Sequence, residues 1–145
     1  MHDIEVDQSG RTDRLSEDTA VAFSDEIRGS ILITAAVKRI CYHKLRARHV
    51  RKKLAGVRLF AAALVILLRD RSKELERIFI DQEYPGWEGE ISRHLLRHLS
   101  HLHSDQICFA QIGKKSPAHD LAWRIWQRER EPDKRVTVKE LWEAC

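Results

Sequence analysis

Apolar and polar positions alternate at the start of the chain, where Asp3-Ile4-Glu5-Val6-Asp7 is followed by the turn pair Ser9-Gly10. A period of two residues is typical of a β-strand with one covered face. This strand should present the carboxylate of Asp7 at its C-terminal end. Runs rich in β-branched residues predict two more strands, over 19–24 and 30–37. The short polar links between the three strands predict an antiparallel meander.

The spacing of apolar residues then becomes helical. Between residues 48 and 68 apolar positions recur at steps of three and four, which predicts a long and largely buried helix. The Ser116-Pro117 pair is a favourable start for a later helix. The elements predicted after the meander are a helix over 48–68, a strand over 77–81, a helix over 87–103, a strand over 106–112, a helix over 116–130, a short strand over 136–138 and a terminal helical turn.

The five main strands and three helices follow the order β-β-β-α-β-α-β-α. This order predicts a single α/β domain over residues 1–145, with a five-stranded mixed sheet flanked by helices. Helical crossovers should make the fourth and fifth strands parallel to the first. Ligands of such open sheets gather at the carboxyl ends of the parallel strands. Asp7 and Asp81 both end strands there, so we expect them to lie close together.

Composition narrows the class of protein without identifying it. The 145 residues are 43% hydrophobic and 33% charged, which fits a globular rather than a disordered chain. Three widely separated cysteines form no Cys-x-x-Cys pair, which argues against a zinc ribbon and for reduced thiols in the cytoplasm. The longest apolar run, 59–68, is about half of a membrane span. We therefore expect a cytoplasmic protein with no membrane contact.

The strand order and the Val6-Asp7-Gln8-Ser9-Gly10 turn resemble the ribonuclease H-like superfamily, which includes ribonucleases H, RuvC-type resolvases, transposases and integrases. The resemblance covers about residues 3–130, as topology more than as close sequence. It implies a nuclease that hydrolyses phosphodiester bonds in DNA or RNA with Mg or Mn. It assigns the metal ligands to Asp7, Asp81 and Asp120. The resolvase branch further implies a symmetric homodimer.

One feature departs from the ribonuclease H pattern. Ribonucleases H proper carry a metal-binding Glu in the first long helix, and the stretch 48–68 contains no acid. Glu83 is a candidate for a fourth carboxylate, and His119 for proton transfer beside the metal. Ordinary alternatives remain for each ligand: an exposed strand face for Asp7, a turn cap for Asp81 and a helix-dipole contact for Asp120.

Cations are distributed unevenly. The net charge is +4 and the pI about 9.1, and the basic residues crowd between 38 and 53 with no acid among them. Such a run is either a solvated face or a surface that neutralises phosphates. The candidate nucleic-acid contacts are Lys38, Arg39, Lys44, Arg46, Arg48 and Lys52, together with Lys114 and Lys115 just before the last long helix.

Aromatic residues give a weaker indication of nucleic-acid binding. Tyr84 and Trp87 lie in a turn just after Asp81 and are the better candidates for base stacking. Trp123 and Trp126 are expected in the core. Two other functions fit the same sequence: a non-catalytic nucleic-acid-binding module, or a structural partner protein whose acids only cap turns. Convergence of the carboxylates would favour the nuclease.

Overall fold

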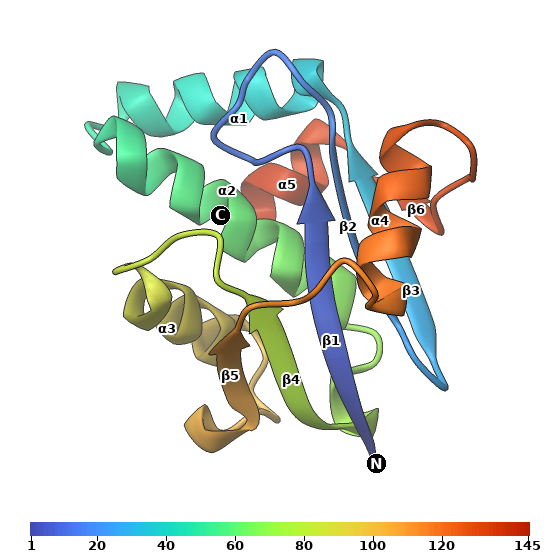
Figure 1. The fold of residues 1–145 in the computed structure, drawn as a ribbon. Coiled ribbons are helices and arrows are strands. Elements are labelled where there is room, and N and C mark those ends of the chain that lie inside the picture. The colour runs from blue at the N-terminus through green and yellow to red at the C-terminus, as the bar shows by residue number, and fades with distance from the viewer.

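A computed structural model describes all residues 1–145 and contains a six-stranded mixed sheet with helices on both faces (Figure 1). The sheet order is β5-β4-β1-β2-β3-β6. The strands are β1 (His2–Ser9), β2 (Thr19–Ser24), β3 (Arg28–Ile33), β4 (Leu75–Asp81), β5 (Ile107–Ala110) and β6 (Lys134–Arg135). The helices are α1 (Ala35–Ala47), α2 (Lys52–Leu68), α3 (Glu88–His98), α4 (Pro117–Trp126) and α5 (Val138–Ala144), with short 3₁₀ turns at Ser72–Glu74 and Ser104–Gln106.

The predicted strand directions are confirmed. β1, β2 and β3 form an antiparallel meander, β4 pairs parallel with β1, and β5 pairs parallel with β4. The prediction of five strands is wrong by one, because β6 pairs parallel with β3. That strand lies before the expected 136–138, since Thr137 caps α5 by accepting from the Glu140 N–H.

The two faces of the sheet are covered differently. α2, with α1, α3 and α5 packed around it, covers one face over a core of 31 buried residues. α4 alone packs across β1, β2 and β3 on the other face (Figure 1). Its small cluster includes Ala20, Ala22 and Ala122, and these short side chains leave space for the helix to lie close to the sheet. α4 therefore carries its residues directly over the end of β1.

The junction between sheet and helices differs from the prediction. β3 ends at Ile33, and α1 occupies 35–47 where the sequence indicated more strand. Thr34 caps this helix by accepting from the Val37 N–H at 3.3 Å. His49 then adopts a left-handed φ of 66°, with paired hydrogen bonds that close the end of α1 in a Schellman motif. Glycine usually marks that position, so the sequence gave no sign of the break between α1 and α2.

α2 is buried along nearly all of its length from Ala55 to Leu68, as its apolar pattern predicted. It begins at Lys52 rather than residue 48. No helix in the structure combines the length and the apolar composition needed to cross a bilayer.

Candidate metal-binding carboxylate cluster

Asp7 and Asp81 meet where the parallel strands β1 and β4 end side by side. The register pairs Val6 with Ile80, which are both buried on the α2 face, so the next residue of each strand points to the α4 face. Ligand oxygens of Asp7, Asp81 and Glu83 all lie within 4.8 Å of one another. The predicted convergence of the two strand-end acids is found, and Glu83 joins them from the following turn.

Asp7 is the buried centre of this cluster, with 4% of its surface exposed. Its Oδ1 accepts the Gln8 backbone N–H at 2.8 Å, and its Oδ2 accepts from Nδ1 of His119 at 2.7 Å. Burial raises the pKa of Asp7, the hydrogen bond from His119 opposes the rise, and the charge of Asp81 adds to it. Asp7 is thus held in one orientation at a site that disfavours its negative charge.

Asp81 and Glu83 form the partly buried side of the cluster. The Ile112 backbone N–H donates to Asp81 Oδ1 at 2.8 Å and ties the end of β4 to the segment after β5. Burial and then the neighbouring Asp81 raise the pKa of Glu83 to about 7. Arg11 is the nearest cation, with its Nη1 3.6 Å from Glu83 Oε2 and 2.8 Å from the Glu83 backbone oxygen.

Arg11 is a residue of this site that the sequence did not indicate. Its guanidinium forms two 3.0 Å bonds to Asp13 and lies 4.6 Å over the ring of Tyr84. It is therefore committed mainly to Asp13 and offers Glu83 only partial compensation. Its position directly after the first strand, two residues before an acid, was the available signal.

The donor set fits a hard divalent cation. Three carboxylates offer only oxygen ligands, which Mg²⁺, Mn²⁺ and Ca²⁺ prefer over the softer metals. Three acids in one partly buried place repel one another, and Arg11 offsets only part of that repulsion. A bound cation would relieve it, so Asp7, Asp81 and Glu83 are the residues that could hold a metal.

Asp120 does not join the cluster. It is exposed, and its Oδ2 accepts from Nε of Arg124 at 2.9 Å, one turn further along α4. Successive helix residues point about 100° apart, so the side chain that faces Asp7 is that of His119. Its side chain is 30% exposed. The expectation that Asp120 lies beside Asp7 and Asp81 is wrong.

The basic run divides into one buried lysine and a set of exposed cations. Lys38 is completely buried, and its Nζ donates to the Arg11 and Arg14 backbone oxygens and to Thr19 Oγ1. It is a structural cation that anchors the β1–β2 loop, and the expectation that it contacts nucleic acid is wrong. The other candidates are exposed and make no ion pair: Arg39, Lys44, Arg46, Arg48, Lys52, Lys114 and Lys115.

The aromatic expectations are reversed at two positions. Tyr84 is buried, with its hydroxyl 2.6 Å from Thr12 Oγ1, so it has no face free for a base. Trp87 is half-buried and packs against the larger core. Trp126 is also half-buried, but Trp123 is 44% exposed. The helical spacing of the two tryptophans could not show which of them faces the sheet.

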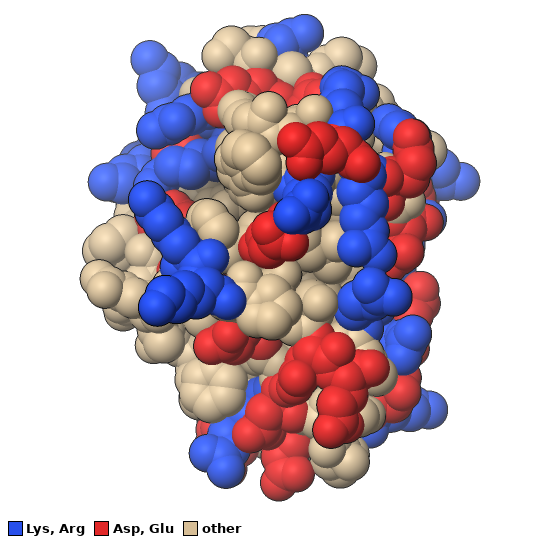
Figure 2. Space-filling view, turned by 45° about the vertical axis from the view of Figure 1, so that its right-hand side comes forward, with Lys and Arg blue, Asp and Glu red and all other residues tan.

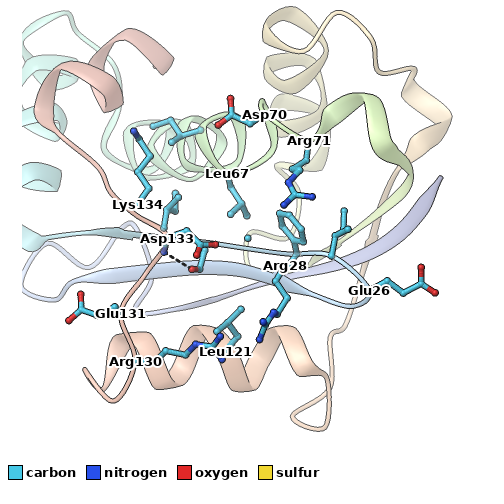
Figure 3. Close-up of a pocket in the computed structure, with 16 residues that line it drawn as sticks. Glu26, Arg28, Leu67, Asp70, Arg71, Leu121, Arg130, Glu131, Asp133 and Lys134 are labelled. Atoms are coloured by element: carbon cyan, nitrogen blue, oxygen red, sulfur yellow. Dashed lines mark hydrogen bonds between the residues drawn. The ribbon is translucent and has the colours of Figure 1, made fainter.

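The largest cleft lies at another part of the molecule. It has a volume of about 580 Å³ and follows the outer edge of β3, between the C-terminal end of α2 and the segment 130–134 (Figure 3). Arg28, Arg71, Arg130 and Lys134 line it together with acids of similar number. No residue of the carboxylate cluster lines this cleft.

Comparisons with protein-family models, with curated proteins and with solved structures found no match for this chain.

Proposed function

We propose that the protein is a divalent-metal-dependent nuclease with a ribonuclease H-like fold. The convergence of Asp7, Asp81 and Glu83 at the carboxyl ends of two neighbouring parallel strands carries this proposal. The strand order β5-β4-β1-β2-β3 supports it, because the meander and its two parallel additions are what the resemblance implies. β6 extends that arrangement at the far edge.

The carboxylates would hold Mg or Mn, with Asp7 as the central ligand. When bound, the cation would supply an activated water and charge stabilisation at the phosphate. The Gln8 backbone N–H and His119 fix the orientation of Asp7, and the Ile112 backbone N–H fixes that of Asp81. These contacts preorganise the ligand oxygens before substrate arrives.

His119 is suited to move a proton at this site. Nδ1 is engaged by Asp7 Oδ2, which leaves Nε2 as the ring nitrogen able to take up or release a proton. The carboxylate holds the imidazole in one orientation, as an orienting acid does in other acid–base pairs. We assign proton transfer to His119 in place of a ligand role for Asp120.

The charge distribution supports nucleic acid as the substrate. Acidic side chains gather at the lower front of the molecule (Figure 2). Near the start of β1, one hollow is lined by Asp3, Asp25, Glu26 and Glu76 together with Arg77. The unpaired cations lie on α1, at the start of α2 and just before α4. Phosphates would therefore be repelled from the amino end of β1 and attracted toward its carboxyl end.

A non-catalytic nucleic-acid-binding module is the second candidate. Neither α1 nor α2 contains an acid, so the helix-one Glu of ribonucleases H has no counterpart. Glu83 would have to supply the third carboxylate from a turn instead. In this alternative the basic surface binds nucleic acid, and the carboxylates do not catalyse its cleavage.

Cleavage of labelled RNA–DNA hybrid, single-stranded DNA, duplex DNA and a four-way junction with Mg or Mn tests the proposal. Glu83→Gln and Asp120→Asn form a matched pair, because one acid belongs to the cluster and the other does not. We expect cleavage of at least one substrate, lost in the Glu83 variant and retained in the Asp120 variant. Metal-dependent binding without cleavage by the wild type would leave the binding module as the function.

A further inference from the structure

Trp123 is the largest side chain that the fold leaves in solvent. It is 44% exposed, and the other large exposed apolar residues are Met1 and Ile40. Its indole makes no hydrogen bond, no ring–ring contact and no cation–ring contact. An exposed indole forgoes the stabilisation that its burial would give. Trp123 is therefore a candidate binding residue, and its position relative to the carboxylates decides what it could bind.

Trp123 lies on the flank of α4 that follows the end of β1. His119, four residues earlier, contacts Asp7, and Trp126, three residues later, donates its indole N–H to the Asp18 oxygen at 2.8 Å. Residues spaced by three or four positions share one side of a helix. Trp123 therefore stands about one turn, roughly 6 Å along the axis, from the histidine of the cluster.

Comparison of Trp123 with Trp126 shows that the fold does not depend on an exposed tryptophan at position 123. Trp126 is held against the β1–β2 loop, where a side chain on Gly10 would lie 2.4 Å from its Nε1. Gly10 itself has a left-handed φ of 73°. That contact closes the flank at the C-terminal end of α4, whereas Trp123 makes no comparable hydrogen bond to a neighbouring segment.

The charges around α4 favour a phosphate backbone. Lys114 and Lys115 precede the helix, are exposed and make no ion pair. Arg124 is already paired with Asp120 and Glu129, so it does not neutralise an incoming phosphate. Free cations thus lie at the end of α4 nearest His119.

An exposed indole on a helix that follows two free cations is suited to binding single-stranded nucleic acid. One ring face is enough to stack one base, while the cations contact the backbone. A protein interface would need a larger apolar patch around the tryptophan, and Trp123 has no large exposed apolar neighbour on α4.

We infer that Trp123 is a base-stacking residue and that the substrate carries an unpaired base next to the carboxylate cluster. The inference rests on the proposed nuclease function and narrows its substrate to single strands, or to duplexes with a frayed or flipped base. Within a paired duplex each base is already stacked on its neighbours, so only the two terminal pairs of a blunt duplex offer a base face to the indole.

Binding of fluorescein-labelled oligonucleotides in EDTA tests this inference without any cleavage. The probes are a single strand, that strand annealed to its complement as a blunt duplex, and the single strand with abasic sites. The proteins are wild type, Trp123→Ala, Trp123→Tyr and the control Ile40→Ala, which removes an equally exposed apolar side chain on α1.

We expect Trp123→Ala to weaken single-strand binding roughly 5- to 150-fold, the effect of one stacked base. Duplex binding should change less than about two-fold, the Tyr variant should retain most of the affinity, and the abasic probe should bind both proteins alike. Equal losses on strand and duplex, or no loss on either, would overturn the inference.

The outcome is separable from that of the proposed function. Binding is measured without divalent cations, whereas cleavage is measured with them. If Trp123→Ala binds the single strand as well as the wild type does, and the wild type still shows metal-dependent cleavage, only the role of Trp123 is refuted. If Trp123→Ala weakens single-strand binding as expected, but the wild type cleaves no substrate, only the nuclease function is refuted.

Discussion

The two ends of β1 carry the same residue type on the same face and place it in opposite surroundings. Asp3 and Glu5 are exposed, Asp3 lying 3.9 Å from Arg77 Nε and Glu5 accepting from the Ser116 hydroxyl at 2.8 Å. Asp7, two residues further on, is 4% exposed and shares its place with Asp81 and Glu83.

This difference teaches that alternation sets the face of a carboxylate but not its chemistry. An acid in solvent keeps its hydration and costs the fold little. A buried acid beside two others needs hydrogen bonds, a proton or a cation. Only the carboxyl end of β1 combines burial with like charges, so only that end is a candidate for catalysis.

The largest expected effect is on cleavage. Asp7→Asn should reduce the metal-dependent cleavage rate by roughly 10³-fold or more, because it removes the central ligand of a unit whose members act together. Asp3→Asn, on the same strand face, should stay within about two-fold of wild type. Initial rates on the preferred substrate measure both, and similar losses in the two variants would contradict the contrast between the ends.

The contrast between buried and exposed groups of like charge recurs among the cations, where it should change the free energy of unfolding. Lys38→Met should lower the free energy of unfolding by about 2–4 kcal/mol, because one buried and two partly buried acceptors lose their donor. Lys53 is exposed, and Lys53→Met should stay within about 0.5 kcal/mol of wild type. Urea unfolding at pH 7 tests the pair, and equal stabilities would show that burial of Lys38 is unimportant.

Lys38 should also give the protein a distinctive alkaline profile. Burial lowers its pKa from 10.5 to about 8. Between these pH values the unfolded chain binds a proton that the folded protein lacks, so the free energy of unfolding of the wild type rises with pH, beyond the contribution that Lys38 makes at pH 7. Unfolding measured from pH 7.5 to 10.5 should show wild type gaining relative to Lys38→Met. Parallel curves for the two proteins would contradict the lowered pKa.

The smallest effect is that of one surface cation on nucleic-acid binding. Lys52 is exposed and unpaired, and Lys52→Ala should make the slope of log affinity against log salt shallower by about 0.9 on duplex DNA. Lys139→Ala, on α5 beside Glu143, should leave the slope unchanged. Identical slopes for all three proteins would show that the start of α2 does not contact the nucleic acid.

Much of the sheet was predictable because strand alternation and the crossover rule are local or general. The meander, the parallel additions and the meeting of Asp7 with Asp81 follow from them. α1 was missed because a β-branched run leads directly into it, and because His49 ends it where glycine is usual.

Side-chain direction and burial could not be read from spacing alone. Asp120 and His119 are adjacent, and only the packing of α4 on the alanines of the sheet decides that His119 reaches Asp7. In the sequence Lys38 cannot be told from its basic neighbours. It is distinguished only in the fold, where the β1–β2 loop covers it and acceptors from residues 11, 14 and 19 bind its Nζ. Trp123 and Trp126 differ for the same reason, since contact with that loop selects one of them.

A titration of Mn²⁺, followed by the electron paramagnetic resonance signal of the free ion, tests the metal site most directly. Wild type, Asp3→Asn and Asp7→Asn would be compared at pH 8, where Glu83, with a pKa of about 7, is mostly ionised. We expect wild type and Asp3→Asn to deplete free Mn²⁺ to the same extent and Asp7→Asn not to deplete it. Equal depletion by all three proteins, or by none, would contradict a metal centre at the carboxyl end of β1.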